Sequence, residues 1–143
     1  MEVSRIFDLL KRYKKKFKPK DDVVAGKENS EWVRYNIDQY IEIVNDISYG
    51  LLKLGVKKGD NIATISNNRP EWNFIDMGIL QTGAIHVPIY PTISESDYQY
   101  ILNHAEVKYV FVSGKELLRK IEYILPNITT LKGLYTFTEH EGV

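Results

Sequence analysis

Three histidines are the side chains best suited to acid–base or metal chemistry at neutral pH. His86, His104 and His140 stand far apart, and none falls in an HExxH pattern or another metal-ligand spacing. His86 lies in an apolar run, where a hydrogen-bonded structural histidine is expected. His104 lies at the expected end of a helix, where a partial positive charge suits the helix dipole. His140 lies in a polar tail, so we expect no metal site and no catalytic histidine.

Two glycine pairs, Gly50 with Gly55 and Gly78 with Gly83, have the spacing of a phosphate-binding P-loop. Neither pair is followed by Lys and Ser/Thr, and both fall within or at the end of expected helices. A phosphate loop needs a strand before it and a helix after it. There is also no G-x-G-x-x-G, so neither a P-loop nor a dinucleotide fingerprint is predicted.

No other catalytic pattern is present in the sequence. A G-x-S-x-G serine elbow is absent, there is no cysteine, and the acidic residues show no pairing for acid–base work. Asn67 and Asn68 are the most chemically suggestive residues, but their types also suit a turn and a helix cap. We therefore assign no catalytic, no cofactor-binding and no metal-binding residue.

The elements that would carry any site centre on residues 59–92. An apolar β-branched strand, Ile62–Ile65, is followed by a helix that opens at Pro70 and closes at Gly83. A second strand begins at Ala84, and Pro88 and Pro91 are expected to end it, because proline cannot donate to a sheet ladder. This strand–helix–strand order predicts a parallel sheet with right-handed crossovers.

Ligands of such sheets bind outside the carboxyl ends of the strands, here at Ser66–Arg69 and Pro88–Thr92. Asn and Pro are common in turns whether or not a ligand is near, so we favour the interpretation of both segments as turns. A small-molecule site built on the two segments stays open as a hypothesis.

The first 20 residues predict a basic amphipathic helix that Ser4 caps. Its apolar stripe precedes and interleaves with a cluster of cations, which comprises Lys11, Arg12, Lys14, Lys15, Lys16, Lys18 and Lys20. A solvated helix face explains these cations best. A weak contact with acidic lipid is the alternative, whereas the absence of a wider basic stripe argues against nucleic acid. Two short β segments over residues 23–35 then predict a hairpin.

The clearest helix spans Asn36 to Leu54, with Asn36 and Gln39 as a capping box and Gly55 as a left-handed terminator. Its predicted apolar face comprises Ile37, Tyr40, Ile41, Val44, Ile47, Leu51 and Leu52. Further on, the patterns predict a helix over 96–104, a buried parallel strand over 109–112, a helix over 115–125 and a strand over 131–137.

The composition is that of an ordinary globular protein, with 143 residues, 43% hydrophobic and 27% charged residues, and a net charge of +0. We therefore expect a single α/β domain over 1–143. A parallel sheet of βαβ units with flanking helices fills residues 36–137, after the N-terminal helix (1–20) and the hairpin (23–35). No export signal is evident, because the basic run follows the apolar residues, and a cytoplasmic location is expected.

Two stretches resemble the AMP-forming acyl-CoA synthetases, a family of adenylate-forming enzymes. They are WVRYNIDQYIEIVNDISYGLLKLGVKKGDNIATIS and QTGAIHVPIYPT. Asn68-Arg69-Pro70-Glu71-Trp72 and Ile101-Leu102-Asn103-His104-Ala105 are similar to the long-chain fatty acid–CoA ligases in particular. The likeness runs from about Trp32 to Tyr135.

The resemblance implies a parent enzyme that uses ATP and Mg²⁺ to form an acyl-adenylate and then transfers the acyl group to coenzyme A. The family's phosphate loop ending in Pro-Lys-Gly, its adenine contacts and its C-terminal lysine are not in this sequence. We therefore expect an inactive N-terminal scaffold whose partner is the remainder of the parent enzyme. A piece cut from a larger domain should expose apolar surface and self-associate. The alternative is a free-standing interaction or acidic-lipid-binding module of the same fold.

Overall fold

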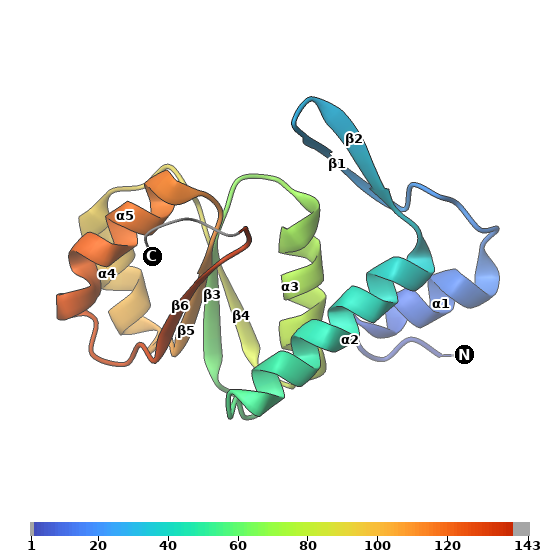
Figure 1. The fold of residues 1–143 in the computed structure, drawn as a ribbon. Coiled ribbons are helices and arrows are strands. Elements are labelled where there is room, and N and C mark those ends of the chain that lie inside the picture. The colour runs from blue at the N-terminus through green and yellow to red at the C-terminus, as the bar shows by residue number, and fades with distance from the viewer. Residues whose placement is uncertain (1, 139–143) are drawn as a thin grey trace. The chain divides into compact units, whose positions relative to one another are not determined.

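The computed structural model describes residues 2–138, which form two compact units that alternate along the chain (Figure 1). The first unit contains the residues up to Lys57 together with Arg69–Gly83. The second contains Lys58–Asn68 and the residues from Ala84 onward.

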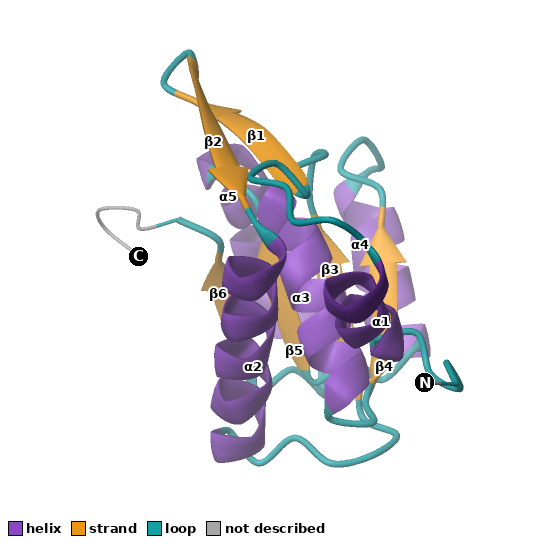
Figure 2. Ribbon diagram, turned by 90° about the vertical axis from the view of Figure 1, so that its right-hand side faces the viewer, coloured by secondary structure: helices purple, strands orange, loops and turns teal. Residues whose placement is uncertain are grey.

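The first unit consists of three helices and a hairpin. They are α1 (Asp8–Lys16), β1 (Val24–Glu28), β2 (Glu31–Tyr35), α2 (Ile37–Lys53) and α3 (Pro70–Gln81). Helix α2 contacts both α1 and α3, and Figure 2 shows the three helices of this unit together. Their shared core comprises Leu10, Ile37, Tyr40, Val44 and Phe74. At its centre the Phe74 ring meets the rings of Tyr35 and Tyr40 edge-on, at centroid distances of 5.0 Å.

Helix α2 begins and ends as predicted. The Asn36 side chain accepts from the Gln39 N–H at 2.9 Å, and the Gln39 side chain accepts from the Asn36 N–H at 2.9 Å. At the other end Gly55 has a φ of 86°, and the Val56 N–H donates to the Leu51 carbonyl at 3.1 Å. This is the hydrogen bond of a Schellman motif, in which a left-handed glycine turns the chain out of the helix.

The predicted hairpin is confirmed, with its turn at Asn29 and Ser30. Both residues have positive φ, 48° and 69°, as a type I′ turn requires. Pro70 stands at the first position of α3, also as predicted.

Two predictions in this unit are wrong. Ser4 does not cap α1, because the helix begins only at Asp8. The Ser4 hydroxyl instead donates to the Asp8 carboxylate at 3.4 Å. Leu52 is 52% exposed, and Ser48 takes its place on the buried face of α2, where the hydroxyl lies 3.0 Å from the carbonyl oxygen of Gly78. Because α3 approaches α2 closely here, this position takes a small polar side chain that can bond to the α3 backbone.

The second unit is a parallel sheet with two helices on one face (Figure 1). Its elements are β3 (Asn61–Ile65), β4 (Ile85–Ile89), α4 (Glu95–His104), β5 (Tyr109–Val112), α5 (Lys115–Ile124), a 3₁₀ turn (Leu125–Asn127) and β6 (Gly133–Thr136). The strand order is β4-β3-β5-β6, and each neighbouring pair is parallel. The predicted parallel α/β class is therefore confirmed.

The sheet and its two helices share one apolar core. Val110 and Val112 of β5 and Ala63 and Ile65 of β3 point into it, and Tyr98 of α4 is fully buried there. The alternate residues of each strand lie on the opposite face, because the side chains of a strand alternate with a period of two.

Pro88 does not end its strand, which corrects the predicted boundary. It lies inside β4 and pairs in register with Thr64. Within the described residues β4 is an edge strand, so it pairs on one side only, and a missing N–H on the other side leaves no ladder bond unmade. None of the described helices has the length and apolar character needed to cross a bilayer.

Candidate functional site

The order of the strands places the candidate ligand edge between β3 and β5. The chain goes from β3 to β4 on one side and then crosses to β5 on the other side. Ligands of open α/β sheets bind at such a reversal, outside the carboxyl ends of the strands. The residues that follow these two strand ends are Ser66 and Asn67 after β3 and Ser113 after β5.

Ser113 ties the two strand ends together. Its hydroxyl accepts from the Asn67 N–H at 3.1 Å, and its own N–H donates to the Ile65 carbonyl at 3.0 Å. Ser113 is not among the residues that the sequence patterns single out. A small polar residue directly after a buried strand was the available signal, but which strand lies beside β5 could not be read from it.

The two segments predicted to line this edge have different surroundings. The Ser66 hydroxyl donates to the Asn67 carbonyl at 2.7 Å, so it closes a local turn. In the second segment the carbonyl of Tyr90 accepts from the Tyr98 hydroxyl of α4 at 3.1 Å. Arg69 belongs to the other compact unit. The edge therefore shows turn and helix contacts, and its use as a small-molecule site stays a hypothesis.

Arg69 and Glu71 form a two-pronged ion pair at the start of α3. Arg69 Nε and Nη2 donate to the two Glu71 oxygens at 2.8 and 2.7 Å, and both side chains are less than a quarter exposed. Burial acts to raise the pKa of Glu71, but hydrogen bonds from Arg69 and from its own backbone bring the pKa below its ordinary value. We interpret the pair as structural, because the two charges neutralise each other.

The hairpin packs beside this ion pair. A Cβ at Gly26 would lie 2.6 Å from Cδ of Pro70, so β1 runs directly over the first turn of α3. Burial raises the pKa of Tyr35 on β2, and the carboxylates of Glu71 and Glu28 raise it further. These shifts result from packing and neighbouring charge in a structural contact.

The two histidines that the structure describes, His86 and His104, each contact a neighbouring side chain. His86 Nε2 lies 2.8 Å from the hydroxyl of Thr64, which is fully buried on β3. The ring of His104 stacks on Tyr100 at a centroid distance of 5.5 Å. His140 lies outside the described residues.

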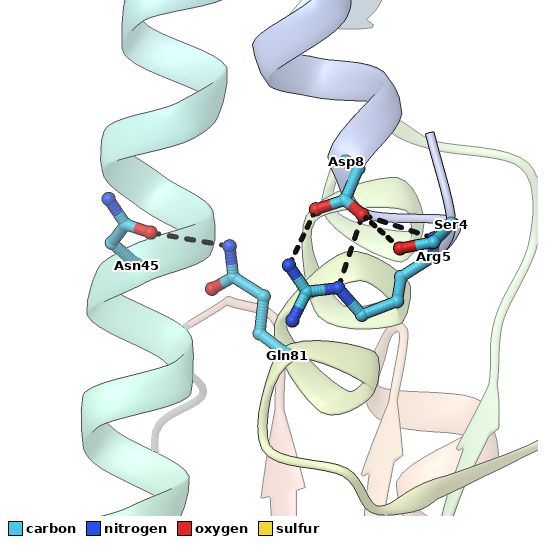
Figure 3. Close-up of polar contacts among 5 residues, drawn as sticks. All are labelled: Ser4, Arg5, Asp8, Asn45 and Gln81. Atoms are coloured by element: carbon cyan, nitrogen blue, oxygen red, sulfur yellow. Dashed lines mark hydrogen bonds and ion pairs between the residues drawn. The ribbon is translucent and has the colours of Figure 1, made fainter. Parts of the chain in front are cut away.

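A pocket of about 290 Å³ lies in the first unit, between the start of α1 and the C-terminal halves of α2 and α3 (Figure 3). The Arg5 guanidinium on its wall donates to the Asp8 carboxylate at 2.9 and 3.1 Å, and this bond holds the pKa of Asp8 below its ordinary value. Gln81 accepts from the Ser48 hydroxyl at 2.6 Å and donates to Asn45 at 3.4 Å. These polar groups bond to one another, and none is a nucleophile beside a base.

Within residues 2–138, no group of three or more His, Asp or Glu side chains is placed to hold a metal ion. The polar side chains described above form hydrogen bonds and ion pairs that hold strands and helices in place. That this chain carries no catalytic residue stays a prediction.

Comparison with known families gives a match over most of the chain. Residues 11–139 match the model of the AMP-binding enzyme family. Fatty acyl-CoA synthetase A of Dictyostelium discoideum is 31% identical over 107 residues, covering 75% of this chain and 15% of the relative. The long-chain-fatty-acid–CoA ligase ACSBG1 of Rattus norvegicus is 31% identical over 113 residues, covering 79% of this chain and 16% of the relative.

Solved structures share the fold at lower identity. The long-chain-fatty-acid-CoA ligase FadD1 from Archaeoglobus fulgidus superimposes with a TM-score of 0.84 at 20% identity, over 99% of this chain and 29% of that one. The N-terminal domain of FACL13 from Mycobacterium tuberculosis gives 0.79 at 21% identity, over 94% of this chain and 34% of that one.

The anthranilate CoA ligase AuaEII, solved with anthranoyl-AMP, gives a TM-score of 0.80 at 24% identity, over 93% of this chain and 25% of that one. The chain spans 15 to 16% of the length of the two curated relatives described above. With the family match covering residues 11–139 and the same fold in solved ligases, this chain belongs to the AMP-binding enzyme family.

Proposed function

We propose that this chain is the N-terminal part of a long-chain fatty acid–CoA ligase. The parent enzyme would activate a fatty acid with ATP to an acyl-adenylate and then form the thioester with coenzyme A. The observation that carries the proposal is the family match over residues 11–139, combined with relatives named as fatty acyl-CoA synthetase and long-chain-fatty-acid–CoA ligase.

The role proposed for the chain itself is that of a structural scaffold for the parent enzyme. It supplies a four-stranded parallel sheet whose carboxyl edge, at Asn67 and Ser113, would form one side of a larger cleft. The residues present do not fit ATP and Mg²⁺ by themselves, since the sequence has no phosphate loop and Arg5 and Arg69 are already paired with carboxylates. ATP, Mg²⁺ and coenzyme A would be held by the remainder of the parent enzyme.

The test is adenylate formation, measured as fatty-acid-dependent exchange of pyrophosphate into ATP. The 143-residue chain alone should give no exchange with a long-chain fatty acid. A longer chain read from the same gene, which includes the phosphate loop ending in Pro-Lys-Gly, should give it.

The longer chain without residues 1–143 should be inactive, because it would lack one layer of its fold. Exchange by the 143-residue chain alone would refute the scaffold role. A gene that ends at Val143 would refute the ligase proposal. The single-domain organisation, the cytoplasmic location and self-association remain predictions.

A further inference from the structure

Helix α1 presents a face of cations that have no ion-pair partner. Lys11, Arg12, Lys15 and Lys16 are all exposed, and none of them forms an ion pair with a carboxylate within residues 2–138. Their spacing places them on one side of the helix, as residues three and four apart are neighbours. Lys14, on the flank, is the exception, since it pairs with Asp38 of α2.

An exposed apolar ridge runs beside these cations. Ile6, Leu9 and Phe17 are 58%, 45% and 58% exposed, and Phe17 stacks on Tyr13 at 5.2 Å. Leu10 of this helix is buried in the apolar core of the unit, and Tyr13, partly buried, packs against that core. The helix and the residues that flank it therefore carry large apolar side chains that the packing on α2 leaves exposed.

We propose that these residues form a docking surface for an anionic lipid bilayer. The surface comprises Leu9, Lys11, Arg12, Lys15, Lys16 and Phe17, and is named here the α1 surface. An interfacial helix inserts apolar side chains at the boundary between headgroups and acyl chains, while flanking cations remain at the phosphates. The ridge and the unpaired cations of α1 provide both parts.

The ridge distinguishes a bilayer from nucleic acid as the partner. Cations alone suffice for a phosphate backbone, because that binding comes from the release of counterions. Exposed leucine and phenylalanine side chains gain nothing there, but they leave water when they enter a bilayer. The docking surface is independent of the ligase proposal, because its charges and apolar side chains would act in the same way on any chain that carried them.

The experiment is sedimentation of the whole 143-residue chain with vesicles. One set is pure phosphatidylcholine and the other contains about 30% phosphatidylglycerol, at 0.1 M and 0.5 M NaCl. We expect partition into the anionic vesicles to be at least tenfold stronger at 0.1 M, and most of it to be lost at 0.5 M because salt screens the cations.

Two variants separate the parts of the α1 surface. Replacing Lys11, Arg12, Lys15 and Lys16 by Gln keeps good helix formers in place and should lower the anionic partition at least tenfold. Leu9→Ser with Phe17→Ser should lower it severalfold and leave the salt dependence. Circular dichroism melts establish that each variant is folded.

A matched control removes the same charge elsewhere. Lys58, Lys115, Arg119 and Lys132 are exposed cations of the second unit, and their replacement by Gln should change the partition less than twofold. Equal losses in the two cation variants would overturn the α1 surface in favour of net charge alone. Absence of anionic partition, or equally tight binding of a DNA duplex at the same salt, would overturn the bilayer as its partner.

Discussion

At the scale of single residues, the shifted pKa values of this protein arise from burial, from close ion pairs and, at Asp97, from hydrogen bonds with Ser94. Arg69 lowers the pKa of Glu71, and Arg5 lowers that of Asp8. A shifted pKa often marks a catalytic group, but structural ion pairs shift pKa values in the same way. Each of these carboxylates pairs with an arginine of the first unit, so we interpret both ion pairs as structural contacts at the start of a helix.

Tyr40 provides a pH test of the core. Burial, followed by the nearby carboxylate of Asp76, raises its pKa to about 12, against about 10 for a free tyrosine. Between these two values the folded chain keeps a proton that the unfolded chain loses, so stability should fall as pH rises from about 10 to 12.

Tyr40→Phe should therefore remove about 1 to 2 kcal/mol of that alkaline loss, measured as the urea unfolding free energy at pH 8 and pH 11. Tyr123→Phe is the control, because Tyr123 is 80% exposed. The same pH slope in both variants would show that Tyr40 ionises freely in the folded chain.

At the scale of elements, close helix packing determines which small residues are required. Gly78 on α3 faces Ile47 on α2, and a Cβ at this glycine would lie 2.4 Å from Ile47 Cγ2. Gly50 on α2 has nothing within 4 Å of the corresponding position. The two glycines therefore form a matched pair, one in a helix contact and one on the surface.

Gly78→Ala should destabilise the chain by roughly 1 to 3 kcal/mol, since the added methyl overpacks the α2–α3 contact. Gly50→Ala should stabilise it by about 0.5 to 1 kcal/mol, because alanine is the better helix former. Chemical denaturation with a fixed m-value gives both numbers.

Adding Ile47→Ala to Gly78→Ala provides the check on mechanism. The double variant should lose less stability than the two single changes added together, because one methyl takes the space that the other vacates. Additive losses would mean that the clash with Ile47 is not the cause.

At the scale of the whole molecule, the described sheet ends in two edge strands, β4 and β6. Ile85 on β4 and Tyr135 on β6 are 52% and 37% exposed. An exposed apolar edge strand is a template for pairing with another chain. The relatives described are roughly six times longer than their match to this chain, so their further residues are available to cover such surface.

The isolated chain should therefore self-associate. Light scattering should give a mass that rises with concentration above the 16.6 kDa of one chain. Ile85→Lys with Tyr135→Lys should shift the mass toward the monomer, because lysine side chains on edge strands block edge-to-edge pairing. Tyr123→Lys, on α5, should not. A monomer at all concentrations would contradict this prediction.

Most elements could be predicted from the sequence, because their signals are local. Asn36 and Gln39 cap α2 with each other, Gly55 ends it, and Pro70 opens α3, and each of these contacts spans a few residues. The errors arose where the deciding neighbour is far away in the chain. Leu52 is exposed and Ser48 is buried because of how closely α3 approaches α2. Pro88 lies within β4 because β4 is an edge strand of the described sheet.

The sequence by itself determined the elements, the parallel class of the sheet and the family likeness, since periodicity, caps and motif wording depend on short spans. Only the tertiary structure decided the strand order β4-β3-β5-β6 and the pairing of Asn67 with Ser113, which are 46 residues apart. It also decided that the apolar ridge of α1 is half exposed. Periodicity indicates that a helix has an apolar face, but how much of that face is covered depends on the neighbours that pack on it.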